Sequence, residues 1–468
     1  MLFPTFDFLL FFIIVVAGLL VVRRQHKAGK LFLLAASYAF YAQWNWHYCL
    51  LLAFISLTAW TGGLALTAAH TVLARRIAAG ATISALLGLL AYFKYFDFLV
   101  GNINAAATAT GMGWQVPFVE VILPVGISFI TFHGISYVVD VYRGDVAACL
   151  WPSDILLYLS FFPQLIAGPI VRASAFLPQL AKPADSPPPI APAVVLIVGG
   201  LFKKVVLANY LATDLVDPVF FDPASFGAAD LVIAAYGYAI QIYCDFSAYS
   251  DIAIGVAALL GYRFPVNFDQ PYRASTLRDF WRRWHISLSS WLRDYLYKPL
   301  GGDRRGKWRT GINLAITMLL GGLWHGASWK FVFWGALHGG GLAVERALGL
   351  RGLRQTSQVT RLAATLLVFH FVCLGWIFFR ADSYGTAWTY LTGIAVLRPG
   401  IAQASPFVLA LLLLGFMMQV VPRDLPQRLG GALEPMPRWA LGALAGVAVV
   451  LIDAMGPPGV APFIYFQF

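Results

Sequence analysis

Long apolar runs alternate with short polar breaks along almost the whole chain. Crossing a hydrocarbon core of about 30 Å takes about 20 residues in a helix, and runs of roughly this length recur. We place them near residues 3–22, 31–46, 48–68, 78–99, 117–139, 190–212, 230–259, 311–348, 361–380, 405–421 and 438–455. The pattern predicts an all-α integral membrane protein with about 11–13 membrane helices, including short re-entrant ones.

Two segments between these runs do not have the pattern of simple spanning helices. Residues 158–180, YLSFFPQLIAGPIVRASAFLPQL, are apolar but contain three prolines, which interrupt helical hydrogen bonds. Broken backbone cannot face lipid, so we expect short or re-entrant helices buried in protein. Residues 268–309 combine many arginines and lysines with tryptophans and tyrosines. This mixture predicts an amphipathic or re-entrant segment at the cytoplasmic side of the membrane.

Composition supports a membrane protein rather than a soluble one. Of the 468 residues, 59% are hydrophobic and 12% are charged, and the mean hydropathy is +0.72; soluble domains carry about 25% charged residues. The 33 lysines and arginines outnumber the 22 acidic residues, and they lie in short loops, as the positive-inside rule describes. We expect membrane lipids rather than nucleic acid as partners of this charge, and one integral domain over residues 1–468.

The first apolar run predicts the orientation of the chain. It is followed by the basic segment RRQHKAGK, residues 23–30. Basic loops favour the cytoplasmic side of a membrane. We therefore expect a multi-pass protein whose N-terminus lies outside.

The cysteines predict no redox or metal chemistry. Cys49, Cys149, Cys244 and Cys373 are scattered through apolar stretches and form no CxxC pair. This spacing is typical neither of a disulfide framework nor of a metal site. We expect no metal and no permanently bound cofactor.

Two histidines are candidates for chemistry. His325 lies in the largely uncharged stretch TMLLGGLWHGASWKFVFWGALHGGG, residues 317–341, with glycines on both sides. An ionisable residue at membrane depth is a functional candidate, and glycines allow a ligand or backbone to approach closely. A neutral imidazole there could act as a general base, although a histidine bonded to a carbonyl between helices fits equally well. His285, within RRWHISLS, could assist proton transfer or simply pack at an interface.

The arginines near His285 also have two interpretations. Arg282 and Arg283 belong to a dense cationic cluster with Trp284. Basic side chains commonly extend to anionic lipid heads and need no other ligand. A group of guanidinium donors near a buried histidine could equally hold the phosphates of coenzyme A.

Several stretches carry a family resemblance. They are LPVGISFITF, SFFPQLIAGPIVR, GLFKKVVLANYLA, QIYCDFSAYSDIAIG, FWRRWHISLSSWLRDYLYKPLGG and LGGLWHGASWKFVFWGALHG. Together they resemble the membrane-bound O-acyltransferase family, and within it the bacterial branch of alginate O-acetylases and teichoic acid D-alanine exporters. The resemblance covers nearly the whole chain and is most specific over residues 241–339. One departure is His133, which stands where we expect glutamine.

The resemblance implies a many-helix fold with a central tunnel and assigns site residues by position. The catalytic histidine falls on His325 and the second motif histidine on His285. The residues expected to bind substrate are Arg282, Arg283, Trp284, Trp324, Ser328, Trp329, Phe463 and Phe468. The family also implies a bacterial inner-membrane location.

The chain ends on PFIYFQF, and this tail resembles aromatic C-terminal motifs proposed to accept an acyl group in related systems. Tyr465 would be the acceptor there. A phenol, with a pKa of about 10, lies between a thiol and a sugar hydroxyl as a leaving group, so an acyl-tyrosine could relay acetyl onward. An interfacial aromatic belt is the alternative interpretation. We expect residues 456–468 to form an extended tail.

The resemblance implies an acetyl-CoA-dependent membrane O-acetyltransferase that serves an exported polysaccharide, alginate- or cellulose-like, through an extracytoplasmic SGNH-type partner transferase. Two alternatives are a transporter or flippase with histidines as proton relays, and an acyltransferase acting on lipid or peptidoglycan. The sequence shows no inverted repeat, which weighs against the transporter.

Overall fold

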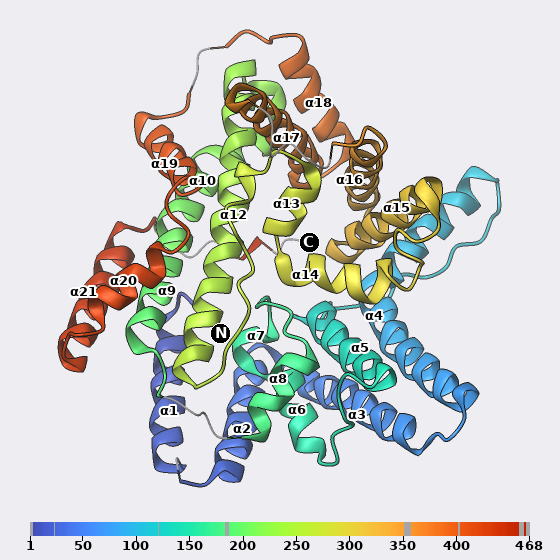
Figure 1. The fold of residues 1–468 in the computed structure, drawn as a ribbon. Helices are drawn as coiled ribbons and strands as arrows, with labels where there is room; N and C mark the ends of the chain where they lie inside the picture. Colours follow the sequence, from blue (N-terminus) through green and yellow to red (C-terminus); the bar gives the residue numbers. More distant parts are fainter. Residues whose placement is uncertain are drawn as a thin grey trace. The chain divides into compact units, whose positions relative to one another are not determined.

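The computed structural model describes residues 3–22, 24–119, 121–182, 187–350, 357–400, 403–457 and 463–464. The chain forms two compact units, one of residues 1–188 with 260–264 and one of residues 189–259 with 265–468. Every regular element in the described ranges is a helix, as the apolar pattern predicts (Figure 1).

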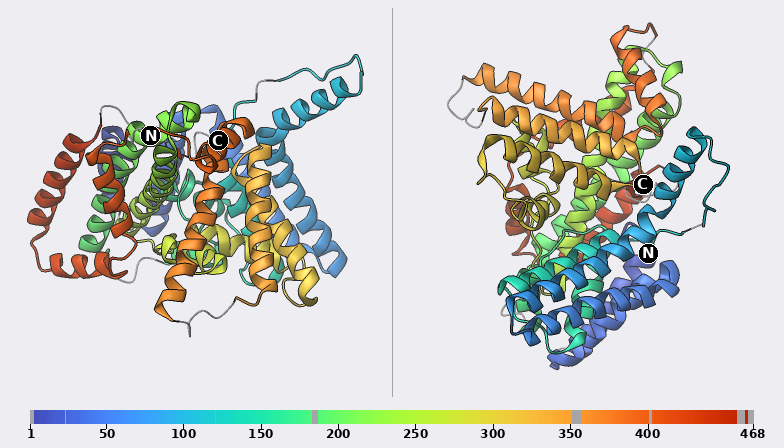
Figure 2. Two further views of the ribbon diagram at one scale, coloured as in Figure 1. Left: turned by 90° about the horizontal axis from the view of Figure 1, so that it is seen from above. Right: turned by 90° about the vertical axis from the view of Figure 1, so that its right-hand side faces the viewer.

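The first unit is built from eight described helices. They are α1 (Phe6–Val22), α2 (His26–Asn45), α3 (His47–Ala68), α4 (Val72–Ala109), α5 (Ile127–Arg143), α6 (Pro152–Ser160), α7 (Phe162–Leu165) and α8 (Ala173–Ala181). Helices α3, α4 and α5 pack against one another, as Figure 2 shows. Lys30 on α2 forms an ion pair with Asp154 on α6, with 2.6 Å between Nζ and Oδ1, which fastens two helices far apart in sequence.

The second unit is arranged around α12 (Ala228–Leu259), whose apolar span is 78% buried inside the protein. Before it come α9 (Ile190–Phe202), η1 (Lys203–Ala208), α10 (Asn209–Leu211), η2 (Ala212–Val216), α11 (Asp217–Phe221) and η3 (Pro223–Ser225). After it come η4 (Pro271–Arg273), α13 (Leu277–Arg283), α14 (Ile286–Leu292), η5 (Arg293–Tyr297), α15 (Gly306–His325), α16 (Trp329–Ala347), α17 (Gln358–Arg380), α18 (Tyr384–Ala395), α19 (Pro406–Met417), α20 (Leu425–Leu433) and α21 (Arg438–Met455). Helix α12 packs against α9, η1, α17, α18 and α19.

Six described helical stretches are long and apolar enough to cross a membrane. They are α3, α4, the run Ile190–Phe221, α12, α17 and α21, while α1 and α19 are apolar but shorter. These eight correspond to eight of the apolar runs read from the sequence. The run Ile190–Phe221 includes two π-helical turns, η1 and η2, a form that is frequent at functional sites.

Two predicted runs differ from the structure. The run at 117–139 becomes helical only at Ile127, because Pro117 and Pro124 interrupt the preceding backbone. The run at 311–348 is not one helix but two, α15 and α16, separated by a turn after His325. Apolarity alone does not reveal this break, since it falls within an unbroken apolar stretch.

Glycines allow α15 and α16 to pack closely. A Cβ atom on Gly322 would overlap the backbone carbonyl oxygen of Phe331, and one on Gly335 would overlap that of Met318. At Gly339 an added Cβ would lie 3.0 Å from the Cα of Ala315. The glycines around the candidate histidine therefore serve close backbone approach, one of the two roles that the sequence left open.

The two irregular segments consist of short helices. Residues 158–180 form the end of α6, then α7 and most of α8, which confirms the prediction of short helices there. Residues 268–309 contain η4, α13, α14 and η5, none longer than seven residues, before α15 begins. Neither α13 nor α14 is long enough to cross a bilayer.

Candidate active site

His325 is the last residue of α15 and is 5% exposed. Its imidazole contacts three aromatic rings edge to face, with centroid distances of 5.1 Å to Trp324, 5.2 Å to Trp334 and 5.2 Å to Phe379. The α15–α16 turn thus holds the imidazole inside an aromatic pocket. Such surroundings exclude water and limit the rotation of the ring.

His285 occupies the junction between α13 and α14. Its backbone is left-handed, with φ at 42°, a conformation that is uncommon for residues other than glycine and that often marks functional positions. The preceding helix is fixed at its start by Thr276, whose hydroxyl accepts a hydrogen bond from the backbone of Asp279 at 3.0 Å. The side chain of His285 is completely buried.

Asn267 determines which nitrogen of His285 carries the proton. Its Oδ1 lies 3.1 Å from the backbone nitrogen of Ser287, which can only donate, so this atom is the amide oxygen. The same oxygen lies 3.2 Å from Nδ1 of His285 and must accept there as well. Nδ1 therefore bears the hydrogen, and Nε2 carries the lone pair of a neutral imidazole.

The structure brings the two histidines into one site. Trp324 contacts both imidazoles, with its centroid 6.1 Å from that of His285 and 5.1 Å from that of His325. Burial lowers the pKa of His285 well below its usual value, and the nearby charge of a protonated His325 lowers it further. His285 is therefore neutral at physiological pH and able to accept a proton at Nε2.

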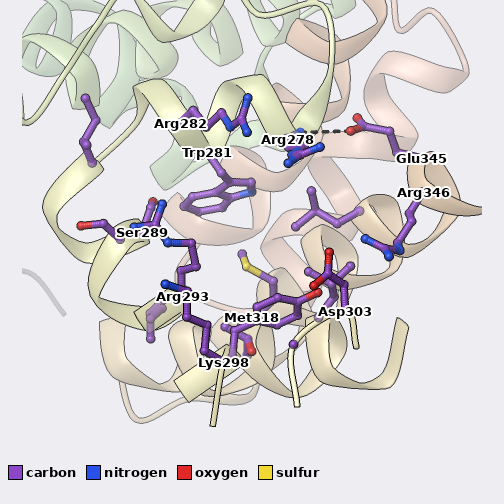
Figure 3. A pocket seen from close by; sticks show the side chains of 18 of the residues that line it. Arg278, Trp281, Arg282, Ser289, Arg293, Lys298, Asp303, Met318, Glu345 and Arg346 are labelled. Atoms are coloured by element: carbon purple, nitrogen blue, oxygen red, sulfur yellow. Dashed lines mark hydrogen bonds between the residues drawn. The ribbon is translucent and has the colours of Figure 1, made fainter. Parts of the chain in front are cut away.

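A cavity of about 700 Å³ lies beside the histidine site. Figure 3 shows that basic side chains from several elements converge on it. Its charged lining consists of Arg278, Arg282, Arg293, Lys298, Arg304 and Arg346, with Asp303 and Glu345 as the acidic members. The excess of positive charge suits a ligand that carries several negative charges.

Aromatic contacts connect this cavity to His325. Trp281 lines the cavity and contacts Trp334, with 5.6 Å between ring centroids, and Trp334 contacts His325 in turn. Met318, another lining residue, precedes His325 by seven positions on α15, which corresponds to about 10 Å along the helix axis. The cationic cavity and the histidines are therefore adjacent parts of one region within the second unit.

The described end of the chain also reaches this region. Phe463 and Ile464 are buried. The ring of Phe463 contacts Phe246 at 6.0 Å, and Phe246 contacts the imidazole of His285 at 4.5 Å. Tyr465 and Phe468 lie outside the described residues, so their predicted roles stay predictions.

Comparison with known proteins identifies the family of the chain. The family model for the membrane-bound O-acyltransferase family, MBOAT, matches residues 152–383. A probable alginate O-acetylase AlgI of Azotobacter vinelandii is 38% identical over 94% of both chains. The corresponding protein of Pseudomonas putida is 37% identical over the full length of both. A peptidoglycan O-acetyltransferase of Helicobacter pylori is 35% identical over 79% of this chain and 74% of its own.

The chain belongs to the membrane-bound O-acyltransferase family. It is therefore a multi-pass membrane protein and an O-acyltransferase. Membership of this family favours the O-acyltransferase hypothesis over the alternative hypothesis of a transporter. The match includes both histidines and every residue that lines the cationic cavity.

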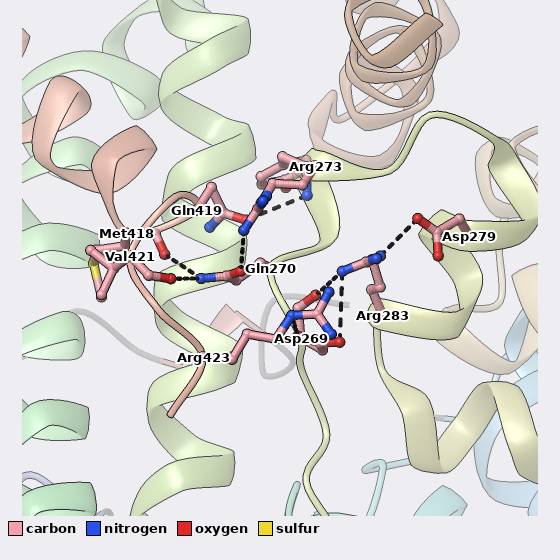
Figure 4. Close-up of polar contacts among 10 residues, drawn as sticks. Asp269, Gln270, Arg273, Asp279, Arg283, Met418, Gln419, Val421 and Arg423 are labelled. Atoms are coloured by element: carbon pink, nitrogen blue, oxygen red, sulfur yellow. Dashed lines mark hydrogen bonds and ion pairs between the residues drawn. The ribbon is translucent and has the colours of Figure 1, made fainter. Parts of the chain in front are cut away.

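Within this MBOAT protein the two predicted arginines have different surroundings. Arg282 lines the cationic cavity. Arg283 is not among the lining residues: its Nε lies 2.8 Å from Asp279, and its NH1 lies 3.6 Å from Asp269, which also pairs with Arg423 at 3.0 Å (Figure 4). Its two ion pairs indicate that Arg283 stabilises the segment before His285 rather than contacting substrate directly.

The other predicted binding residues also separate into groups. Trp324 contacts both histidines, whereas Trp284 is buried against Phe268, Phe280 and Trp376. Ser328 accepts a hydrogen bond from the backbone of Lys330 and caps α16. Trp329 is 54% exposed.

His133, the departure from the family pattern, is buried in the first unit. Its Nε2 accepts a hydrogen bond from the backbone of Val171 at 3.1 Å, and its ring meets Tyr158 edge to face. This bond ties α5 to the irregular segment after α7. The observed role of the side chain is to hold that segment.

Sequence reasoning missed several residues of the site. Asn267, Trp334 and Phe379 all contact one of the two histidines but lie 18, 9 and 54 residues from them in sequence. No motif spacing indicated Asn267 or Phe379. The density of tryptophans near His325 was the only available signal for Trp334.

Proposed function

We propose that this protein takes acetyl from cytoplasmic acetyl-CoA and passes it across the membrane for O-acetylation of an exported polysaccharide, alginate-like or cellulose-like. The cationic cavity beside the histidine pair is the observation that carries this proposal. Two relatives, an alginate O-acetylase and a peptidoglycan O-acetyltransferase, support acetyl as the group and an extracytoplasmic polymer as the acceptor.

We expect coenzyme A to match the cavity in charge and in length. Its phosphates would bind the convergent guanidinium groups, which form strong charge-assisted hydrogen bonds with phosphate oxygens. From there the flexible pantetheine arm would extend past Trp281 and Met318 toward His325, along the roughly 10 Å of helix that separates them. The thioester would then lie near the imidazole.

His325 acts as general base in the proposed reaction, and neutral His285 assists it or orients the acyl group. In the first step His325 takes the proton from the phenol of Tyr465, and the phenolic oxygen attacks the thioester carbonyl. The C–S bond breaks, an O-acetyl bond forms, and the coenzyme A thiolate takes up the proton. The aryl ester then passes acetyl to an SGNH-type partner transferase outside the membrane, which restores the phenol.

Mass spectrometry of the C-terminal peptide tests this function. Purified protein is incubated with acetyl-CoA, and the wild type is compared with His325→Ala and Tyr465→Phe. An acetyl group on the peptide that is absent from both variants is the expected result. A folded His325→Ala variant that acetylates the peptide at the wild-type rate would remove His325 from the mechanism.

The polymer that finally receives acetyl is tested separately, because in the proposed pathway the partner transferase and not this protein binds it. Since one relative acts on peptidoglycan, membranes from cells with and without the gene are compared for O-acetyl content of exported polysaccharide and of peptidoglycan. Loss of acetyl from the exported polysaccharide alone is expected.

A further inference from the structure

A buried ion pair meets the end of the described chain inside the second unit. Nζ of Lys204 on η1 lies 2.8 Å from Oδ1 of Asp245 on α12. The other carboxylate oxygen, Oδ2, accepts a hydrogen bond from the backbone nitrogen of Ile464 at 2.9 Å. The side chains of Lys204 and Asp245 are 8% and 3% exposed. One carboxylate therefore joins three segments that are far apart in sequence.

Further contacts hold the same end of the chain. The ring of Phe463 contacts Tyr249 at 4.9 Å and Phe246 at 6.0 Å, both on α12. Upstream, the chain passes so close to η1 at Gly456 that an added Cβ would lie 2.6 Å from Val205. Gly456, Phe463 and Ile464 thus contact η1 and α12, the two elements that supply the ion pair.

A structural ion pair alone does not explain this arrangement. Burying two charges is expensive, and apolar side chains of similar volume often stabilise a fold as well. Charged residues within apolar spans are uncommon and are functional candidates. Here Lys204 holds Asp245 through Oδ1, which leaves Oδ2 as the acceptor for a backbone N–H of the buried residue Ile464.

We propose that the Lys204–Asp245 pair is a seat that positions the C-terminal segment beside the histidine site. Phe463 contacts Phe246, which in turn contacts His285, and the residue after Ile464 is Tyr465. The seat rests on the proposed function, because the seated segment carries the tyrosine proposed to accept acetyl. Lys204 and Asp245 act through the tail, so they are positioning residues and not catalytic ones.

The chain offers a matched control for this pair. Lys203, the neighbour of Lys204, pairs with Asp251 on α12 at 2.6 Å. This second ion pair joins the same two elements, and the described contacts of Asp251 do not include the C-terminal segment. Asp251→Asn therefore removes an ion pair between the same two elements, with a more exposed carboxylate (32% against 3%), and leaves the seat intact.

Two variants target the hydrogen bond between Asp245 and Ile464, one by changing the acceptor and one by changing the donor. Lys204 and Ile464 approach opposite oxygens of the Asp245 carboxylate. In Asp245→Asn one of these two positions becomes an NH2 group, a donor that faces a donor, so one of the two contacts is lost. Ile464→Pro removes the N–H from the tail and leaves the ion pair unchanged; its control is Ile464→Val. If Asp245→Asn disturbs folding, Ile464→Pro still tests the seat.

Hydrogen exchange of the C-terminal peptide without acetyl-CoA is the first measurement. Because a hydrogen bond to a charged acceptor is being lost, exchange in both seat variants should be about tenfold to hundredfold faster. In the two controls it should match the wild type. Unchanged exchange in Asp245→Asn and Ile464→Pro would overturn the seat.

Acetyl transfer is measured next as a function of acetyl-CoA concentration. The seat variants should show a lower kcat with an unchanged KM for acetyl-CoA, because the donor cavity is untouched. Faster exchange together with undiminished transfer would support the seat and overturn the acyl-tyrosine step of the proposed function. Failure of the seat, seen as unchanged exchange, is therefore distinguishable from failure of the proposed function.

Discussion

The tautomer of His285 yields the sharpest prediction about the chemistry. Asn267→Asp replaces the amide by a carboxylate of the same shape. The second carboxylate oxygen would still meet Ser250, whose hydroxyl accepts from the Asn267 amide at 3.0 Å and could donate instead. The substitution therefore introduces a charge next to Nδ1 with little change in packing.

The size of the effect follows from the distance. A carboxylate 3.2 Å from the imidazole favours the imidazolium by about 5 kcal/mol at an effective dielectric constant of about 20. This attraction opposes the burial that lowers the pKa of His285 in the wild type and raises that pKa in the variant. A protonated Nε2 has no lone pair, so the variant should lose acetyl transfer at neutral pH and regain it as the pH rises.

The assay is the rate of acetyl-CoA-dependent transfer between pH 6 and 9 in detergent or nanodiscs. The wild type should show no dependence on the titration of His285 in this range, whereas Asn267→Asp should gain activity with pH. Ser250→Ala is the control, because it removes a partner of the amide without adding charge. Superimposable pH profiles of wild type and Asn267→Asp would refute the role of Nε2 as an acceptor.

Two further predictions concern packing and donor binding. Gly322→Ala should lower the free energy of unfolding by about 1–3 kcal/mol, because its Cβ would overlap the carbonyl of Phe331. At Gly340 an added Cβ would have no atom within 4 Å. Gly340→Ala should therefore leave the free energy of unfolding unchanged or raise it slightly, because alanine has the higher helix propensity. Melting curves in detergent would check both, and equal melting temperatures would contradict the packing argument. Arg282→Ala and Arg346→Ala should each raise KM for acetyl-CoA by about tenfold, more strongly at low salt, with kcat little changed. A rise in KM over the wild type that is equally large at low and high salt would argue against phosphate binding there.

Much of the fold could be predicted from the sequence, because membrane burial imposes a simple rule on each segment separately. Runs such as 230–259 and 438–455 form helices because, inside a bilayer, the backbone N–H and C=O groups can find hydrogen-bond partners only within the protein. Prolines also act locally, so the short helices of residues 158–180 were predictable. The break after His325 was not, because it depends on glycine-mediated packing between α15 and α16.

The sequence by itself determined the all-α membrane class, the family, the cationic segment and the two histidines as candidates. Only the tertiary structure decided that Trp324 contacts both of those histidines and that Asn267 sets the tautomer of His285. Tertiary structure likewise separates Arg282, in the cavity, from Arg283, which pairs with Asp269 and Asp279. The physical reason is range: hydropathy and proline act within one segment, whereas hydrogen bonds and ion pairs depend on which distant segments the packing brings together.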